Sequence, residues 1–205
     1  MSSGAGTAGT ELSFAELAGD EVGAALDDLA RLRIAVFAGW PYLYEGDLTY
    51  EARYLSRFAA SPGAVVVAAR TADGRMVGAA TAAPLSDHAD EFAVPFAHAG
   101  LDPAEFFYLA ESVLLPEFRG RGAGRVFFDM REAAARAQDF SRAVFASVLR
   151  PADHPARPAD YVALDAFWRR LGYQPLDGLQ AEFCWRDLGE PAESCKRLQV
   201  WGRDL

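Results

Sequence analysis

The stretch best suited to chemistry is residues 118–124, which read FRGRGAG and place three glycines and two arginines within seven positions. Glycines let backbone N–H groups approach an anion, and the N-terminus of a following helix adds a positive partial charge. The stretch follows an apolar run, residues 106–115, and precedes a run with helical periodicity, residues 125–138. This order predicts an anion-binding loop between a strand and a helix.

Known glycine loops differ in what else they require. A Walker loop needs Gly-Lys-Ser/Thr, whereas Gly124 is followed by Arg125 and Val126. A dinucleotide fingerprint needs G-x-G-x-x-G and an acid at the end of the next strand, but the spacing here is G-x-G-x-G, and that strand ends at Leu149 and Arg150. The alternative is a purely structural role, in which the glycines only allow a tight turn at the start of the helix.

Composition narrows the class of protein. A chain of 205 residues with 51% hydrophobic and 24% charged residues is typical of one globular domain. The net charge of −9 disfavours binding to nucleic acid or to an anionic membrane and favours a cationic small molecule. We expect no metal site, since the polar loop of residues 86–92 is typical of a solvated segment.

The cysteines and the N-terminal stretch bear on the cellular compartment. Cys184 and Cys195 are too far apart for a C-x-x-C motif, and we interpret both as free thiols in a reducing compartment. No signal peptide pattern or run of 18 apolar residues is present, so we expect a cytoplasmic protein. Lys196 is the only lysine, which leaves little scope for Schiff-base chemistry.

Periodicity predicts the elements that must position the loop. Strands are expected at residues 11–17, 64–70, 76–85, 106–115, 142–149 and 180–188, and helices at 21–37, 49–61, 125–138 and 161–172. Residues 85–104 are expected to be irregular. We expect residues 1–10 to be disordered, 11–190 to form the domain, and 191–205 to be an extension packed on the domain or at an interface such as that of a homodimer.

The run LLPEFRGRGAG, residues 114–124, resembles the central motif of the GNAT superfamily of N-acetyltransferases, V-x-P-x-x-R-G-x-G-x-G/A between a strand and a helix. The order of the expected elements over residues 11–190 is similar too. The resemblance implies a single-domain α/β fold with a mixed, mostly antiparallel sheet of six to seven strands. It also implies that this sheet is splayed at the fourth and fifth strands and flanked by about four helices.

The resemblance also implies an enzyme that uses acetyl-CoA as co-substrate and acylates a primary amine of a small molecule by direct attack. Backbone amides of the loop would hold the coenzyme pyrophosphate, through Arg119, Gly120, Arg121, Gly122, Ala123 and Gly124. The preceding residues Val113, Leu114 and Leu115 would pair by main chain with the pantetheine arm, as a strand edge recruits an extended ligand.

Direct attack requires a base for the amine proton, and Glu111, the single carboxylate in its apolar run, is the candidate. The alternative is that Glu111 faces solvent or pairs with an arginine such as Arg33 or Arg53. For the acid, the family often has a tyrosine where this chain has Trp168. Tyr161 and Tyr108 are possible substitutes, and water is another.

The acceptor pocket is expected in residues 39–46. Trp40, Tyr42 and Tyr44 would form an aromatic wall, with Glu45 and Asp47 attracting a cationic amine. The alternative is that these aromatics pack helices onto the sheet. Two other functions stay open: a non-catalytic acyl-CoA-binding domain of the same fold, and a phosphate-binding α/β protein of another family.

Overall fold

Two adjacent strands, β2 (Val65–Arg70) and β3 (Met76–Pro84), form the buried centre of the protein. In the computed structural model, which describes residues 11–205, nearly every side chain of the two strands is buried. Val65 and Val67 face one hydrophobic cluster, and Val66 and Ala68 face another, because successive side chains of a strand point to opposite faces. Both faces of the sheet must therefore be covered. The expected disorder of residues 1–10 lies outside the described residues.

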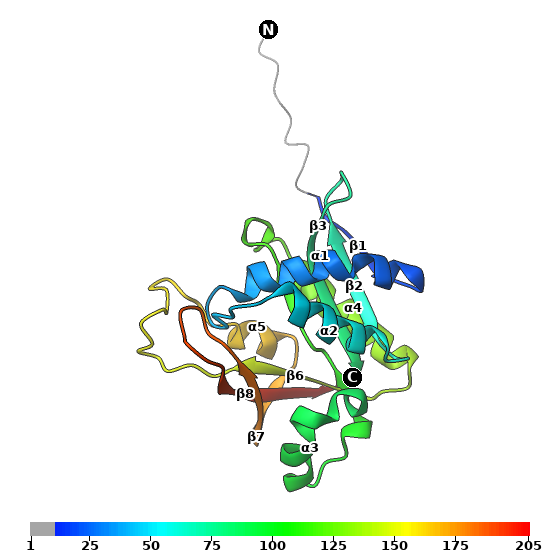
Figure 1. Cartoon of the computed structure of the whole chain (residues 1–205). Helices are drawn as coiled ribbons and strands as arrows, with labels where there is room; N and C mark the ends of the chain where they lie inside the picture. The colour runs from blue at the N-terminus through cyan, green and yellow to red at the C-terminus, as the bar shows by residue number, and fades with distance from the viewer. Residues whose placement is uncertain (1–10) are drawn as a thin grey trace.

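Helices provide the two covers (Figure 1). On one face, α1 (Asp20–Phe37) and α2 (Leu48–Ala59) bury Leu29 and Leu55 against β2 and β3. On the other, α4 (Ala123–Ala137) buries Phe127 and Phe128, and α5 (Asp165–Arg170) packs beside it. Within residues 11–205, no helix combines the length and the apolar character needed to cross a bilayer.

The described residues form one eight-stranded sheet in the order β1-β2-β3-β4-β6-β8-β7, with β5 paired to β3 beside that path. The remaining strands are β1 (Ser13–Leu17), β4 (Phe107–Tyr108), β5 (Ser112–Leu114), β6 (Arg142–Val148), β7 (Gln174–Trp185) and β8 (Ser194–Asp204). All pairs are antiparallel except β4 with β6. The predicted α/β class with a mixed, mostly antiparallel sheet is confirmed, and the strand expected at 106–115 is divided into β4 and β5.

The sheet opens where β4 ends. Phe107 and Tyr108 pair with Ala143 and Val144 of β6, and the N–H of Leu109 donates to the carbonyl of Val144 at 2.8 Å. Beyond this point β5 stays with β3, whereas β6 continues along β8. One edge of β5 therefore faces an opening in the sheet, as expected for a splay between the central strands.

Two element predictions are wrong in detail. The irregular segment at 85–104 contains a short 3-10 helix, Leu85–His88, and α3 (Ala89–His98). Phe92 and Phe96 stabilise α3, because their four-residue spacing places both side chains in one buried cluster. The last helix begins at Asp165 instead of residue 161, so Tyr161 lies in the preceding loop.

The C-terminal segment is part of the sheet. Residues 191–205, expected as an extension packed on the domain or at an interface, include β8, which lies between β6 and β7 and pairs with both. The register places Cys184 of β7 opposite Cys195 of β8, and the two form a disulfide, so the expectation of two free thiols is wrong. Their separation of 11 residues carried no motif, and only the hairpin brings them together.

Candidate active site

The glycine loop leaves its backbone accessible. Gly120 and Gly122 have φ angles of 76° and 84°, in the left-handed region that glycine adopts without strain. A Cβ atom at either position would meet nothing within 4 Å. Gly122 caps α4, and its carbonyl accepts hydrogen bonds from the N–H groups of Arg125 and Val126. The loop therefore presents open backbone at the N-terminus of a 15-residue helix, which suits an anion.

The other loop residues divide into two kinds. Ala123 is buried, and a Cβ at Gly124 would lie 3.4 Å from the ring of Phe167, so these two can offer a ligand mainly the N–H groups of the first helical turn. Arg119 and Arg121 are exposed. Nε of Arg119 donates to the carbonyl of Leu114 at 3.1 Å, which ties the loop back to β5.

Of the three predicted pantetheine contacts, Val113, Leu114 and Leu115, one has a backbone N–H that points away from β3. Leu115 donates its N–H to Val77 of β3 at 3.0 Å, and Val113 stands opposite Ala79. Because main-chain groups alternate in direction along an antiparallel strand, the N–H groups of Ser112 and Leu114 point away from β3, into the opening. Leu114 is therefore the predicted pantetheine contact with the right orientation, whereas Val113 and Leu115 use their backbone within the sheet.

Arg131 of α4 lies beneath the opening and is almost completely buried. Its Nη1 donates to the carbonyls of Thr81 at 3.1 Å and Glu111 at 3.0 Å, and its Nη2 donates to the hydroxyl of Ser112 at 2.8 Å. Burial lowers the pKa of Arg131 to about 10, so the guanidinium keeps its charge at neutral pH. Arg131 thus satisfies carbonyls that the break between β4 and β5 leaves without a regular ladder.

Glu111 lies in that break, with 8% of its surface exposed. One carboxylate oxygen forms an ion pair with Nη1 of Arg33 at 2.6 Å, and the other accepts a hydrogen bond from the hydroxyl of Tyr54 at 3.2 Å. Burial and the neighbouring Glu111 raise the pKa of Tyr54, which keeps its phenol protonated as a donor. The expected alternative of an ion pair with Arg33 is realised, while Arg53 is exposed.

Arg33 is shared between two carboxylates. Its Nε forms a short hydrogen bond with Glu51 of α2, whose side chain is fully buried. The guanidinium lies 4.3 Å from the centre of the Tyr54 ring and 5.3 Å from that of Phe37. One cation between two anions leaves this buried group, Arg33 with Glu51 and Glu111, with a formal charge of −1.

A cavity of about 120 Å³ adjoins this group. Its walls are mainly aromatic, and they include Glu111, Arg33, Tyr42, Tyr44, Tyr50, Tyr54, Tyr108, Phe183 and Trp185. Two predicted acceptor residues, Tyr42 and Tyr44, thus lie in one cavity with the predicted base. Burial, more than the nearby Glu111, raises the pKa of Tyr42 to about 12, so its hydroxyl is neutral at physiological pH.

Trp40 and Tyr161 lie to one side. Trp40 contacts the rings of His154 at 5.1 Å and Tyr161 at 5.9 Å, and neither Trp40 nor Tyr161 is among the described residues that line the cavity. Burial, with a smaller effect from Asp165, raises the pKa of Tyr161. Trp168, which replaces the usual tyrosine, packs in the core against Phe145 and Trp201.

The two carboxylates expected to attract an amine already have partners. Glu45 forms an ion pair with Arg186 at 3.0 Å, and Asp47 caps α2 by accepting from the N–H groups of Thr49 and Tyr50, both at 2.9 Å. Both carboxylates line a second cavity, of about 280 Å³, next to the first.

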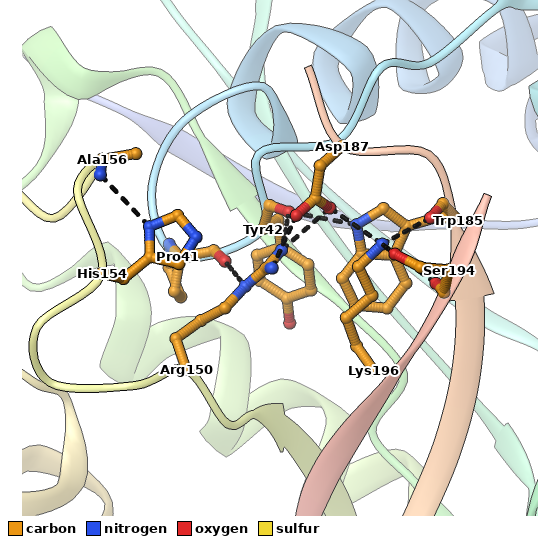
Figure 2. Close-up of polar contacts among 9 residues, drawn as sticks. All are labelled: Pro41, Tyr42, Arg150, His154, Ala156, Trp185, Asp187, Ser194 and Lys196. Atoms are coloured by element: carbon orange, nitrogen blue, oxygen red, sulfur yellow. Dashed lines mark hydrogen bonds and ion pairs between the residues drawn. The ribbon is translucent and has the colours of Figure 1, made fainter. Parts of the chain in front are cut away.

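The segment that carries Tyr42 is held by a buried polar cluster, Arg150, Asp187 and Lys196, which we call the clamp. Figure 2 shows Arg150 reaching from the end of β6 to the carbonyls of Pro41 and Tyr42, at 2.9 and 2.6 Å. The same guanidinium binds both carboxylate oxygens of Asp187, at 2.6 and 3.0 Å. Lys196 binds Asp187 at 3.0 Å. The clamp therefore fixes the aromatic segment against the β7–β8 hairpin.

Sequence reasoning missed most of these supporting residues. Glu51 and Tyr54 lie one turn apart on α2, and Asp187 and Lys196 approach each other only through the hairpin. A polar residue on an amphipathic helix ordinarily faces solvent, so the sequence held no signal for the burial of Glu51. The single lysine in the chain was a usable signal, because its isolation pointed to a specific role.

Comparison with known proteins agrees with this geometry. The family model described as acetyltransferase (GNAT) family matches residues 30–173. A search of curated protein sequences gives no match. Among solved structures, a GCN5-related N-acetyltransferase from Kribbella flavida is 21% identical, with 95% of this chain and 98% of that chain covered and a TM-score of 0.58.

Two further structures were solved with coenzyme bound. A phosphinothricin acetyltransferase from Sinorhizobium meliloti, in complex with acetyl-CoA, is 16% identical over 95% of this chain and 88% of that chain, with a TM-score of 0.57. The PaiA N-acetyltransferase from Thermoplasma acidophilum, in complex with coenzyme A, is 10% identical over 95% and 99%, with a TM-score of 0.56. At these identities the likeness shows the fold, whereas the family model covers most of the chain: the protein belongs to the GNAT family of acetyltransferases.

Proposed function

We propose that this protein transfers an acetyl group from acetyl-CoA to a primary amine of a small molecule, by direct attack of the amine in a ternary complex. The observation that carries the proposal is the position of Glu111, in the break where the sheet opens, three residues before Leu114 and facing an aromatic cavity. A base, a free strand edge and an acceptor cavity thus come together at one point of the sheet.

The residues present fit the co-substrate. The open backbone at Gly120 and Gly122 and the first turn of α4 suit a pyrophosphate, and the outward N–H groups of Ser112 and Leu114 suit the amides of a pantetheine arm. Family membership and the coenzyme complexes among similar structures support this assignment.

The chain's residues then have distinct roles. Glu111 accepts the proton of the attacking amine, and a backbone N–H on the open edge of β5 stabilises the charge that develops on the carbonyl oxygen. Tyr42 and Tyr44 hold the acceptor in the cavity. Protonation of the leaving thiolate falls to water or to Tyr108, which lines the cavity, because the indole of Trp168 is not an acid and Tyr161 lies outside the cavity.

A non-catalytic acyl-CoA-binding domain is the competing function. It is favoured by the ion pair of Glu111 with Arg33 and by the absence of a tyrosine at position 168. A phosphate-binding protein of another family is inconsistent with the match over residues 30–173.

The proposal is tested by incubating the protein with acetyl-CoA and each of a panel of small amines. A thiol reagent then measures the coenzyme A that is released. We expect one class of amine to give turnover, and Glu111→Gln to lower kcat by about 10²- to 10⁴-fold, the usual contribution of a general base. Glu190→Gln is a matched control, because Glu190 is exposed and lies outside both cavities.

Thermal protection by acetyl-CoA reports binding, and turnover then separates the two functions. Protection together with turnover supports the transferase, and protection without turnover for any amine supports the binding domain. Full activity of Glu111→Gln between pH 6 and 9 would exclude Glu111 as the base.

A further inference from the structure

We propose that Glu51 is a positioning residue for acyl transfer. Glu51 binds Nε of Arg33 while Glu111 binds Nη1, so the single positive charge of Arg33 does not fully offset the negative charge of Glu111. The inference rests on the proposed function, in which Glu111 removes the amine proton. Glu51 itself does not contact the reacting atoms, and it acts through Arg33.

The geometry fixes Arg33 between its partners. Nε bonds to Glu51 of α2, and Nη1 bonds to Glu111 at 2.6 Å. The guanidinium lies 4.3 Å from the centre of the Tyr54 ring and 5.3 Å from that of Phe37, so it cannot turn toward Glu111 alone without losing both ring contacts. The arginine is therefore divided between two carboxylates by its packing.

The division matters for proton transfer. A carboxylate paired one-to-one with a guanidinium binds a proton weakly, because the cation stabilises its charged form. A second carboxylate on the same cation counteracts this effect, and the two carboxylates then titrate as a coupled pair. With Glu51 bound to Nε of Arg33, less of the positive charge of Arg33 is left to offset Glu111, which makes Glu111 a stronger base.

The other charged or titratable groups near Glu111 keep their states over the working pH range. Burial holds Tyr42 and Tyr54 as neutral phenols, with the pKa of Tyr42 at about 12. Arg131, with its pKa at about 10, binds the backbone carbonyl of Glu111 and stays charged. From β4, Tyr108 lines the same cavity, and β7 and β8 contribute Phe183, Trp185 and Leu198, which do not titrate.

The test compares the pH dependence of kcat for three proteins. The kcat of the wild type is expected to fall at acidic pH, and we call this part of the profile the acidic limb. The limb should be absent in Glu111→Gln, which would assign it to Glu111. In Glu51→Gln we expect the limb to move to lower pH by about one to two units, the size of one nearby charge, and the plateau to fall several-fold. Glu51→Asp keeps the charge, so its limb should return toward that of the wild type.

Arg33→Gln should shift the limb in the opposite direction. Without Arg33, nothing offsets the like charge of Glu51 on that side of Glu111, and the limb should move to higher pH. Glu190→Gln removes an exposed carboxylate outside both cavities, and it should leave the limb in place. A merely structural role of Glu51 would lower stability or kcat without this ordered pair of shifts.

A measurement on the wild type covers the case in which a variant does not fold. Carbon-13 NMR of labelled glutamate carboxyls should show two of them titrating in coupled, two-step curves. Independent single-step curves, or a Glu51→Gln limb that coincides with that of the wild type, would overturn the inference. If no amine gives turnover, the proposed function fails instead, and the two failures are distinguishable.

Discussion

The clamp makes a sharp prediction, because Asp187 is one anion between two cations. Its side chain and those of Arg150 and Lys196 are each less than 10% exposed. Replacing Asp187 by Asn leaves two buried cations facing each other, and loss of one partner of a buried ion pair costs about 3–5 kcal/mol. Replacing Lys196 by Met leaves the bidentate pair of Arg150 with Asp187 intact. The cost is then about 1–2 kcal/mol for the unpaired carbonyls of Trp185 and Ser194.

Urea unfolding followed by circular dichroism measures this order. Both variants should keep the slope of the wild type, and the midpoint should fall further for Asp187→Asn than for Lys196→Met. Both should also raise the KM for the acceptor and leave acetyl-CoA protection unchanged, because the clamp holds Pro41 and Tyr42 and does not touch the glycine loop. A larger loss for Lys196→Met would refute the argument from charge.

The pH dependence gives a second check on Asp187. Burial pushes its pKa up, but the bonds from Arg150 and Lys196 outweigh this effect and hold the pKa below its usual value. A depressed pKa in the folded state means stability that is present above the unfolded value, about 3.9, and is lost as the pH falls through the folded value. The difference in stability between wild type and Asp187→Asn should therefore be constant from pH 5 to 8 and shrink below about pH 4.

Two further predictions concern the loop and the disulfide. Gly122→Val should cost about 1–2 kcal/mol of stability from its φ of 84° and abolish protection by acetyl-CoA. Gly189→Val, at a matched φ of 82° in the β7–β8 turn, should cost the same and keep protection; equal protection in both would exclude the loop as the coenzyme site. Reducing the bond between Cys184 and Cys195, which closes a short loop, should lower stability by at most about 2–3 kcal/mol, measured by thermal melts with and without reductant. An unchanged melt would show that the hairpin pairing alone holds the two strands.

The fold could largely be predicted from the sequence, because short stretches of sequence mark most of its turns and element boundaries. The Asp-Gly turn joined β2 to β3, and the glycine loop marked the junction of β5 and α4. The strand β8 was not predicted, since nothing in its own residues shows that it inserts between β6 and β7. The helix α3 was missed, because Pro95 and several acidic residues in its segment favour a loop reading.

The site could be predicted only in part, for the same reason. Glu111 and the glycines follow one another on one stretch of chain, and the motif identified them together. Arg33 and Glu51 come from two helices, and their contact depends on how α1 packs on α2 over the sheet. Trp40, although adjacent in sequence to the cavity residues, turns toward His154 and Tyr161. Long-range packing decides these positions, and spacing along the chain does not record it.

The buried state of Lys196 has a consequence for chemistry on the protein itself. The only lysine of the chain is 7% exposed, and its ammonium is held by Asp187 and by oxygens of Trp185 and Ser194. An amine held in this way is shielded, so an acyl donor in solution cannot reach the lysine side chain. Since both cysteines are joined to each other, the protein also adds no thiol background to an assay that counts released coenzyme A.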